Sequence, residues 1–159
     1  MRFFMIDRIT SWVVGKSAEA IKNVTLSEDF FSDHFPRRPV MPGVLIIEGM
    51  AQLAGLLLEA SLKQKYGKEA KAVLTVLERT KFRGMIKPGD TLVYQAEVVS
   101  VNEAGGKAVV RALRYQNLVA TTEMLFGFKY VDDPKLEQIR ESLLRTWLAN
   151  GAEERDAKV

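Results

Sequence analysis

The feature that most constrains the fold is the strongly apolar run over residues 44–58, which directly follows a proline-rich segment. Prolines exclude a regular helix or a central strand from residues 32–42, but Pro42 suits the first turn of a helix, where its missing N–H costs nothing. We therefore predict a helix over residues 43–66 that ends at Gly67. Apolar side chains cover nearly all sides of this helix, so most of its faces must be buried.

The rest of the chain predicts strands, because the apolar residues recur with the short period of a half-buried sheet. We expect strands over residues 8–14, 17–26, 72–82, 91–101, 107–115 and 118–130. Turns are expected at Gly15-Lys16, at Pro88-Gly89-Asp90 and at Ala104-Gly105-Gly106, with a short helical turn after Ser27. An amphipathic helix should open at Asp133-Pro134 and span about 134–149, before a frayed tail over 151–159.

These elements predict one domain over residues 1–159, with its core over about 5–130. A single long apolar helix among six strands, most of them joined by hairpins, favours an α+β fold in which an antiparallel sheet wraps around the helix. The apolar run does not predict a membrane span, because it is shorter than the roughly 20 residues that a span needs. It also contains Glu48 and Gln52.

The composition excludes several function classes. The 159 residues contain no cysteine, which excludes disulfides, thiolate nucleophiles and cysteine-ligated metals and is compatible with the cytoplasm, the expected localisation. The single histidine excludes a self-contained histidine-rich metal site, and we expect no metal. A net charge of +3 is too small to indicate nucleic acid as a partner. The apolar part of the N-terminal MRFFMIDR is too short for a secretory signal.

Glu48 is the one carboxylate in the first turns of the apolar helix. Burial raises the pKa of a carboxyl group, and this is how a protein keeps an acid able to donate a proton near neutral pH. Gln52, four residues on, lies on the same helix face and can hold the carboxyl group by a hydrogen bond. The alternative is that Glu48 reaches solvent at the edge of the helix.

Two further groups stand near this acid in the sequence. His34 lies in the proline-braced loop, and its titration range suits a general base, although a lone histidine is more often structural. Gly43 opens the helix, where a backbone N–H can receive a carbonyl oxygen, although it also fits a plain helix start. A base, an acid and an oxyanion donor together suggest proton abstraction next to a carbonyl, followed by loss of a β-leaving group.

Over roughly residues 5–130, the chain resembles the FabZ-like 3-hydroxyacyl-acyl carrier protein dehydratases of bacterial fatty acid synthesis. The matching residues are Ile6-Asp7-Arg8-Ile9, His34-Phe35-Pro36, Pro39-Val40-Met41-Pro42-Gly43-Val44-Leu45-Ile46-Ile47-Glu48, Met50-Ala51-Gln52, Lys81-Phe82-Arg83 and Lys87-Pro88-Gly89-Asp90. The resemblance implies the hot-dog fold, a curved antiparallel sheet around one long α-helix. It also implies a homodimer, often assembled as a trimer of dimers, with each active site shared between two subunits.

The resemblance also implies a role for each site residue. His34 would remove the α-proton of a 3-hydroxyacyl thioester carried by acyl carrier protein. Glu48 of the partner subunit would protonate or orient the departing hydroxyl, directly or through water. The Gly43 N–H would hold the thioester carbonyl, and Gln52 would hold Glu48 in position. No cofactor is needed for this proton transfer. Acyl carrier protein is strongly acidic, and a basic patch could steer it, or else be plain solvated surface. The candidate residues are Arg37, Arg38, Lys81, Arg83 and Lys87.

The sequence departs from the family pattern at four points. Arg37 stands where the family usually has glycine, and Gly49 replaces the commoner alanine after the acid. Residues 72–77 are aliphatic where many members have aromatic residues, and the helix after Asp133 extends past the usual end. Three alternative functions stay open. They are a hot-dog thioesterase, a dehydratase of a secondary-metabolite pathway such as aryl-polyene synthesis, and a non-catalytic acyl-binding protein.

Overall fold

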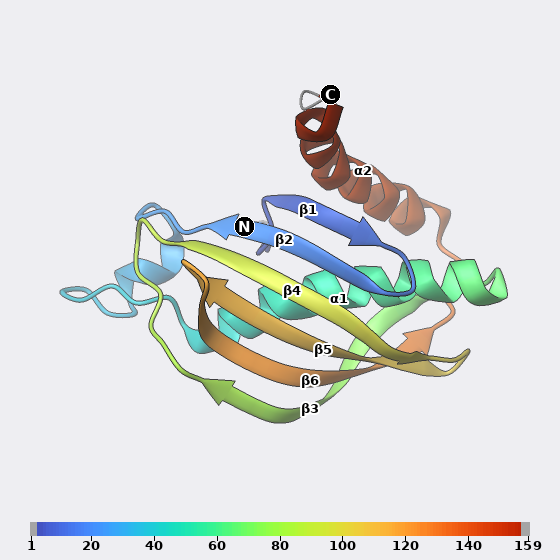
Figure 1. The fold of residues 1–159 in the computed structure, drawn as a ribbon, viewed down its shortest axis with the longest axis horizontal. Helices are drawn as coiled ribbons and strands as arrows, with labels where there is room; N and C mark the ends of the chain where they lie inside the picture. Colours follow the sequence, from blue (N-terminus) through green and yellow to red (C-terminus); the bar gives the residue numbers. More distant parts are fainter. Residues whose placement is uncertain (1–2, 157–159) are drawn as a thin grey trace.

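Six strands form a single antiparallel sheet in the order β1-β2-β4-β5-β6-β3 in the computed structural model, which describes residues 3–156 (Figure 1). The strands are β1 (Arg8–Val13), β2 (Ser17–Asn23), β3 (Lys71–Phe82), β4 (Thr91–Val101), β5 (Gly105–Arg114) and β6 (Asn117–Lys129). The curved sheet wraps around helix α1 (Gly43–Tyr66), as the hot-dog prediction requires. The predicted α+β fold is therefore confirmed.

Helix α1 has the predicted bounds. It begins directly after Pro42 and ends at Gly67, whose φ of 66° lies in the left-handed region and whose N–H donates to the carbonyl oxygen of Lys63 at 2.9 Å. By length and composition, α1 is the one helix in the described residues that could cross a membrane. Its apolar composition is accounted for by the core, where Met50 and Leu53 are fully buried beneath the sheet.

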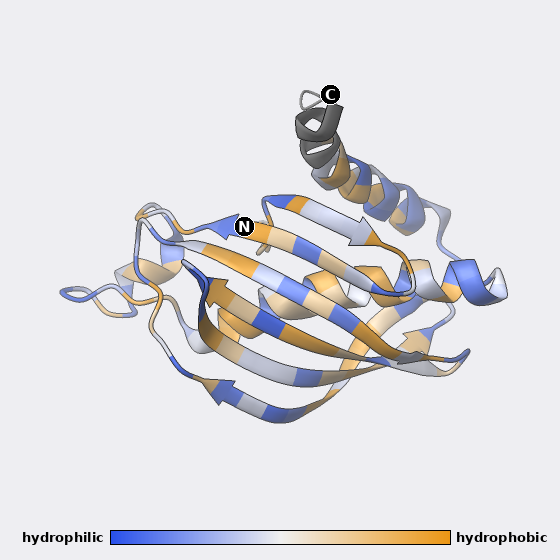
Figure 2. Cartoon of the chain, viewed as in Figure 1, coloured by the Kyte–Doolittle hydropathy of each residue, from blue (hydrophilic) through white to orange (hydrophobic). Residues whose placement is uncertain are grey.

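The sheet buries alternate residues against α1. Strands β2, β4 and β6 show a regular alternation of buried and partly exposed positions, which Figure 2 shows as bands of contrasting hydropathy along each strand. Many inward positions opposite the helix hold alanine. Ala20, Ala108 and Ala112 are fully buried, and such small side chains let the helix lie close to the strands.

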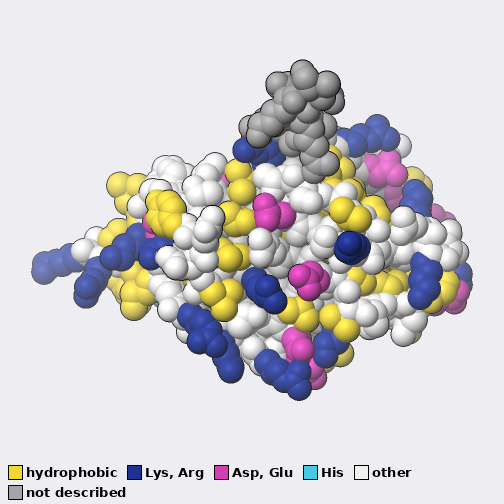
Figure 3. Space-filling model, viewed as in Figure 1, with side chains coloured by type: hydrophobic (Ala, Val, Ile, Leu, Met, Phe, Trp, Pro, Cys, Tyr) yellow, Lys and Arg dark blue, Asp and Glu magenta, His cyan; other side chains and the backbone are white. Residues whose placement is uncertain are grey.

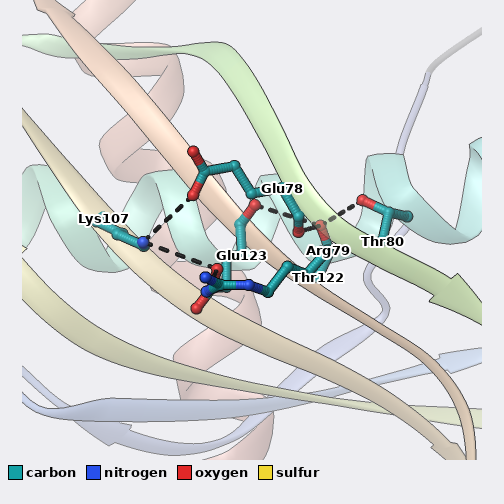
Figure 4. Close-up of polar contacts among 6 residues, drawn as sticks. All are labelled: Glu78, Arg79, Thr80, Lys107, Thr122 and Glu123. Atoms are coloured by element: carbon teal, nitrogen blue, oxygen red, sulfur yellow. Dashed lines mark hydrogen bonds and ion pairs between the residues drawn. The ribbon is translucent and has the colours of Figure 1, made fainter.

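Strand β3 lies at one edge of the sheet and pairs only with β6. Its pairing register shifts twice, and Arg79 adopts a φ of 50° at the second shift. Figure 4 shows the polar side chains on this part of the sheet, which are Glu78, Arg79, Thr80, Lys107, Thr122 and Glu123. Glu123 pairs with Arg79 at 2.6 Å and with Lys107 at 3.8 Å, which links β3, β5 and β6 across the irregular segment.

The predicted turn between β4 and β5 was misplaced. The turn spans residues 102–104, two residues earlier than Ala104-Gly105-Gly106, because the side chain of Asn102 accepts the N–H groups of Ala104 and Gly105 at 2.8 and 3.0 Å. Gly105 and Gly106 belong to β5, where a Cβ on Gly105 would lie 2.2 Å from the carbonyl oxygen of Phe126. These glycines therefore allow a close backbone approach rather than a turn.

Strand β2 is three residues shorter than predicted, because the N–H of Val24 bonds the carbonyl oxygen of Asp90 in the turn before β4, at 2.9 Å. The helical turn expected after Ser27 is a 3-10 helix, η1 (Asp29–Ser32). The remaining strand ends differ from prediction by two residues or fewer.

The C-terminal helix α2 spans Pro134–Asp156 and is longer than the predicted 134–149. Its first turn is capped by the Asp133 side chain, which accepts the N–H groups of Lys135 and Leu136 at 3.1 and 3.2 Å. The predicted frayed tail therefore falls partly within the helix, and residues 157–159 lie outside the described residues. Helix α2 packs beside β1 at the far side of the sheet from β3 (Figure 1).

Candidate active site

The loop between η1 and α1 holds His34 by its backbone and by its ring. The His34 N–H donates to the carbonyl oxygen of Phe30 at 3.0 Å, and the His34 carbonyl oxygen accepts the N–H of Val40 at 3.0 Å. The peptide bond between His34 and Phe35 is cis, and the two rings stack with centroids 4.1 Å apart. The half-buried imidazole is therefore fixed in orientation by a loop that the prolines keep from forming regular structure.

One hydrogen bond determines which ring nitrogen of His34 can act as a base. Nδ1 lies 2.8 Å from the carbonyl oxygen of Val40. Because a carbonyl oxygen only accepts hydrogen bonds, Nδ1 must carry the proton. The neutral ring then has its free lone pair on Nε2, which is the nitrogen available to remove a proton from a substrate.

Gly43 begins α1 beside the end of β3. Within the described residues its N–H donates no hydrogen bond, as expected for the first residue of a helix. A Cβ at this position would lie 2.8 Å from the ring of Phe82, so a larger residue would displace that exposed ring. The result is a backbone donor at the positive end of the helix dipole, close to the loop that carries His34.

Glu48 lies in the second turn of α1 and is half-buried. The predicted hydrogen bond is present, because Gln52 Nε2 donates to Glu48 Oε1 at 3.0 Å. The same amide is also fixed by the N-terminal segment. Nε2 donates to the carbonyl oxygen of Phe3 at 2.8 Å, and Oε1 accepts the N–H of Met5 at 3.0 Å. Both ends of the Gln52 amide are used, so its orientation is fixed.

A single chain does not join the predicted base to the predicted acid. Among the described residues, no hydrogen bond or ion pair links His34 to Glu48, and the hydrogen bonds of each run to different parts of the structure. His34 is held by its own loop, whereas Glu48 is held by Gln52, which in turn bonds the backbone of the N-terminal segment. His34 with its loop and Glu48 with Gln52 are thus two separately held candidate half-sites.

The five predicted basic residues are all exposed. Arg37 and Arg38 lie at the tip of the His34 loop, and Lys81, Arg83 and Lys87 lie on the end of β3 and on the segment that follows it. The loop and this segment contact one another, because the N–H of Met41 donates to the carbonyl oxygen of Ile86 at 2.8 Å. Figure 3 shows Lys and Arg side chains reaching out at this end of the molecule.

Tyr94 is a residue near the site that the sequence analysis missed. Its ring is fully buried under α1, and a Cβ on Gly49 would lie 2.3 Å from its hydroxyl oxygen. Gly49, the departure from the family alanine, therefore makes room for the phenol next to Glu48. The hydroxyl has no hydrogen-bond partner among the described residues, and burial raises the pKa of Tyr94 above its usual value. A glycine inside an apolar helix was the available signal.

Comparison with known proteins places the chain in a family. The FabA-like domain matches residues 1–122. The chain is 42% identical over 125 residues to the 3-hydroxyacyl-(acyl-carrier-protein) dehydratase FabZ of Chlamydia muridarum, covering 78% of this chain and 81% of the relative. It is 40% identical over 127 residues to that of Caldicellulosiruptor bescii, covering 80% and 89%.

Two solved structures share the fold. The dehydratase heterocomplex ApeI:P of Xenorhabdus doucetiae superposes with a TM-score of 0.64 at 16% identity, over 86% of this chain and 89% of the other. The smu.793 protein of Streptococcus mutans, solved with acetyl coenzyme A, gives 0.63 at 15% identity, over 84% and 96%. At such identities the likeness shows the fold alone, and it is the sequence relatives that place this chain in the FabA-like family of hot-dog proteins.

Proposed function

We propose that this protein dehydrates (3R)-3-hydroxyacyl-acyl carrier protein to the trans-2-enoyl thioester in fatty acid biosynthesis. Its named relatives are 3-hydroxyacyl-(acyl-carrier-protein) dehydratases at 38–42% identity over about four fifths of the chain. The observation that carries the chemistry is the hydrogen bond between His34 Nδ1 and the Val40 carbonyl oxygen. It leaves Nε2 as a neutral base, which an elimination next to a thioester carbonyl requires.

The reaction proceeds as a balanced transfer of two protons. His34 Nε2 takes the proton from C2 of the acyl chain, and the charge that develops on the thioester oxygen is stabilised by the Gly43 N–H and the helix dipole. Glu48 gives its proton to the C3 hydroxyl, which leaves as water while the C2–C3 double bond forms. The Gln52 amide keeps the Glu48 carboxyl group aimed at the leaving group.

We further propose that the base and the acid of one active site come from two subunits of a homodimer. Two observations support this arrangement. His34 and Glu48 are not joined within one chain, and β3 leaves apolar side chains exposed along a free sheet edge, among them Val73, Val76 and Leu77. Assembly of three such dimers into a hexamer, and location in the cytoplasm, remain predictions.

The docking of acyl carrier protein is the second part of the proposal. The basic surface formed by Arg37, Arg38, Lys81, Arg83 and Lys87 borders both the His34 loop and the N-terminus of α1. An acidic carrier protein bound there would bring its acyl chain to Gly43 and His34. Opposite charge at this position would mainly raise the association rate, and the effect would weaken at high salt.

The test is turnover of 3-hydroxybutyryl and crotonyl carrier protein by two variants. His34→Ala removes the base and Glu48→Gln removes the transferable proton, so each should lower kcat by a factor of about 10² to 10⁴. Circular dichroism should show that both variants keep the fold. Near-wild-type turnover in either variant would contradict the mechanism, and release of free thiol without enoyl product would instead indicate a thioesterase.

Mixing the two inactive variants tests the shared site. If subunits exchange, a mixed dimer holds one active site with both functional residues, so part of the activity should return. The measurement is turnover after co-incubation, with subunit exchange followed by a size or fluorescence label. No recovery despite demonstrated exchange would rule out a site built from two subunits.

A further inference from the structure

The N-terminal segment is the direct support of Gln52. The backbone of Phe3 and Met5 bonds both ends of the Gln52 amide, at 2.8 and 3.0 Å, and the same amide bonds Glu48. A cavity of about 240 Å³ lies beside Gln52 and is bordered by Phe3, Phe4 and Trp147. Because no side chain fills this space beside Gln52, the position of the Gln52 amide is set by the N-terminal backbone that bonds it.

Helix α2 fixes the N-terminal segment. The Trp147 side chain is 6% exposed, and its ring meets the ring of Phe4 edge to face, with centroids 5.9 Å apart and planes at 84°. This is a favourable geometry for an aromatic pair. Phe4 lies between Phe3 and Met5, whose backbone groups bond the Gln52 side chain. Movement of the Phe4 ring would therefore move both hydrogen bonds.

The helix is itself held in place by a second contact with α1. Arg140 pairs with Glu59 at 2.8 Å, and Glu59 also accepts the N–H of Ala72 at the start of β3. Burial is the largest influence on the pKa of Glu59 and raises it, and the facing Arg140 and Lys71 act against that shift. The face of α2 that bears Trp147 is thus fixed relative to the helix that carries Glu48.

We propose that Trp147 is a positioning residue for the acid of the active site, acting through Phe4 and the Phe3–Met5 backbone on Gln52 and Glu48. This proposal rests on the proposed function. The FabA-like match ends at residue 122, so α2 lies wholly outside the matched domain. The helix is then a brace, outside the matched residues, that reaches back to the helix that carries Glu48.

The experiment is a double-mutant cycle between Trp147→Ala and Gln52→Ala, with kcat and KM measured on 3-hydroxybutyryl carrier protein. Trp147→Ala should lower kcat about tenfold with little change in KM, because misplacement of a catalytic group affects the transition state more than binding. Trp147→Phe keeps an aromatic edge and should restore most of kcat. In the Gln52→Ala background, Trp147→Ala should have little further effect, because its route to Glu48 is already cut.

The matched control is Ile139→Ala, on the same helix but with a side chain that is 65% exposed, and it should leave kcat and KM unchanged. Unchanged kcat in Trp147→Ala, or effects of the two substitutions that multiply in the double variant, would overturn the proposal. If Trp147→Ala does not fold, Phe4→Ala tests the same contact from the partly exposed side, with the same outcomes. An inactive wild-type enzyme would instead mean that the proposed function is wrong.

Discussion

At the scale of single residues, the absence of a side chain at Gly49 makes room for the buried phenol of Tyr94. The Tyr94 phenol occupies the place of a Cβ on Gly49, and its hydroxyl is buried without a partner among the described residues. A buried unsatisfied hydroxyl costs stability. The phenol therefore fills the space under the helix turn that carries Glu48, at some cost in stability.

We predict that Gly49→Ala destabilises the protein even though alanine is the better helix former. The new Cβ would lie 2.3 Å from the Tyr94 hydroxyl and 2.4 Å from the ring carbon that bears it, so either the helix or the fully buried Tyr94 ring must shift. Overpacking of this kind costs about 1–3 kcal/mol in the free energy of unfolding. Urea unfolding of the variant measures this loss.

Gly55→Ala, in the same helix, is the matched control for this prediction. A Cβ on Gly55 would lie 3.5 Å from the ring of Phe126, which is an ordinary van der Waals contact. It should stabilise the protein, by up to about 1 kcal/mol, through helix propensity alone. In a Tyr94→Leu background the penalty of Gly49→Ala should shrink. Equal effects of the two glycine substitutions would show that Tyr94 does not set the packing at Gly49.

Side-chain patterns predicted the residues of the candidate site, but they could not predict its backbone contacts. His34, Gly43, Glu48 and Gln52 were identified from residue type, spacing and the family resemblance, and the Gln52–Glu48 hydrogen bond follows from their spacing on a helix. The carbonyl oxygen of Val40, which sets the His34 tautomer, could not be identified. Every residue has a carbonyl, so only the folded loop determines which one faces the ring.

At the scale of elements, the His34 loop is anchored to the sheet through a nearly buried lysine. Lys22, at the end of β2, is 6% exposed and bonds Glu28 at 2.7 Å, with Asp7 a second partner at 3.8 Å. Glu28 directly precedes η1, and the carbonyl oxygen of Phe30 in η1 accepts the N–H of His34. The ion pair thus fixes where the loop leaves the sheet.

Glu28→Ala should therefore weaken both the fold and the site. It leaves the Lys22 ammonium with only the more distant Asp7, and loss of a hydrogen bond to a buried charged group costs about 1.5–3 kcal/mol in the free energy of unfolding. We also expect a lower kcat, because the loop that holds His34 loses its anchor. The matched control is Glu103→Ala, whose pair with Lys68 is exposed on both sides, so its loss should change the free energy of unfolding little. A smaller loss in Glu28→Ala than in the control would contradict the anchoring role.

The elements that were predicted well are those with strong terminal signals. Proline before α1 and glycine after it fixed both ends of that helix, because each residue acts on the local backbone. The turn after β4 was misplaced because the glycines that suggested it serve a non-local purpose, the approach of β6. The length of α2 and its contact with the N-terminal segment depend on tertiary packing, which local patterns do not record.

At the scale of the whole molecule, a single chain leaves one edge of its sheet unpaired among the described residues. The edge of β3 is free and carries apolar side chains, whereas the opposite edge strand, β1, has α2 packed beside it. An exposed apolar edge strand favours pairing with another chain. Pairing of two β3 edges about a two-fold axis would extend the sheet across the dimer and bring the half-sites of two chains to the same interface.

We predict that Val76→Lys on β3 weakens the dimer and the activity together. Val76 is 43% exposed on the free edge, and a two-fold interface places each substitution close to its own copy, so charge repulsion adds to the loss of apolar contact. Loss of a buried valine contact alone is worth about 1.5 kcal/mol or more, which corresponds to at least a tenfold rise in the dimer Kd. Sedimentation velocity over a concentration series measures this shift, and kcat should fall with the monomer fraction. Val13→Lys, on the opposite edge strand and similarly exposed at 47%, should leave both unchanged. A monomeric Val76→Lys variant with full activity would show that one chain completes its own active site.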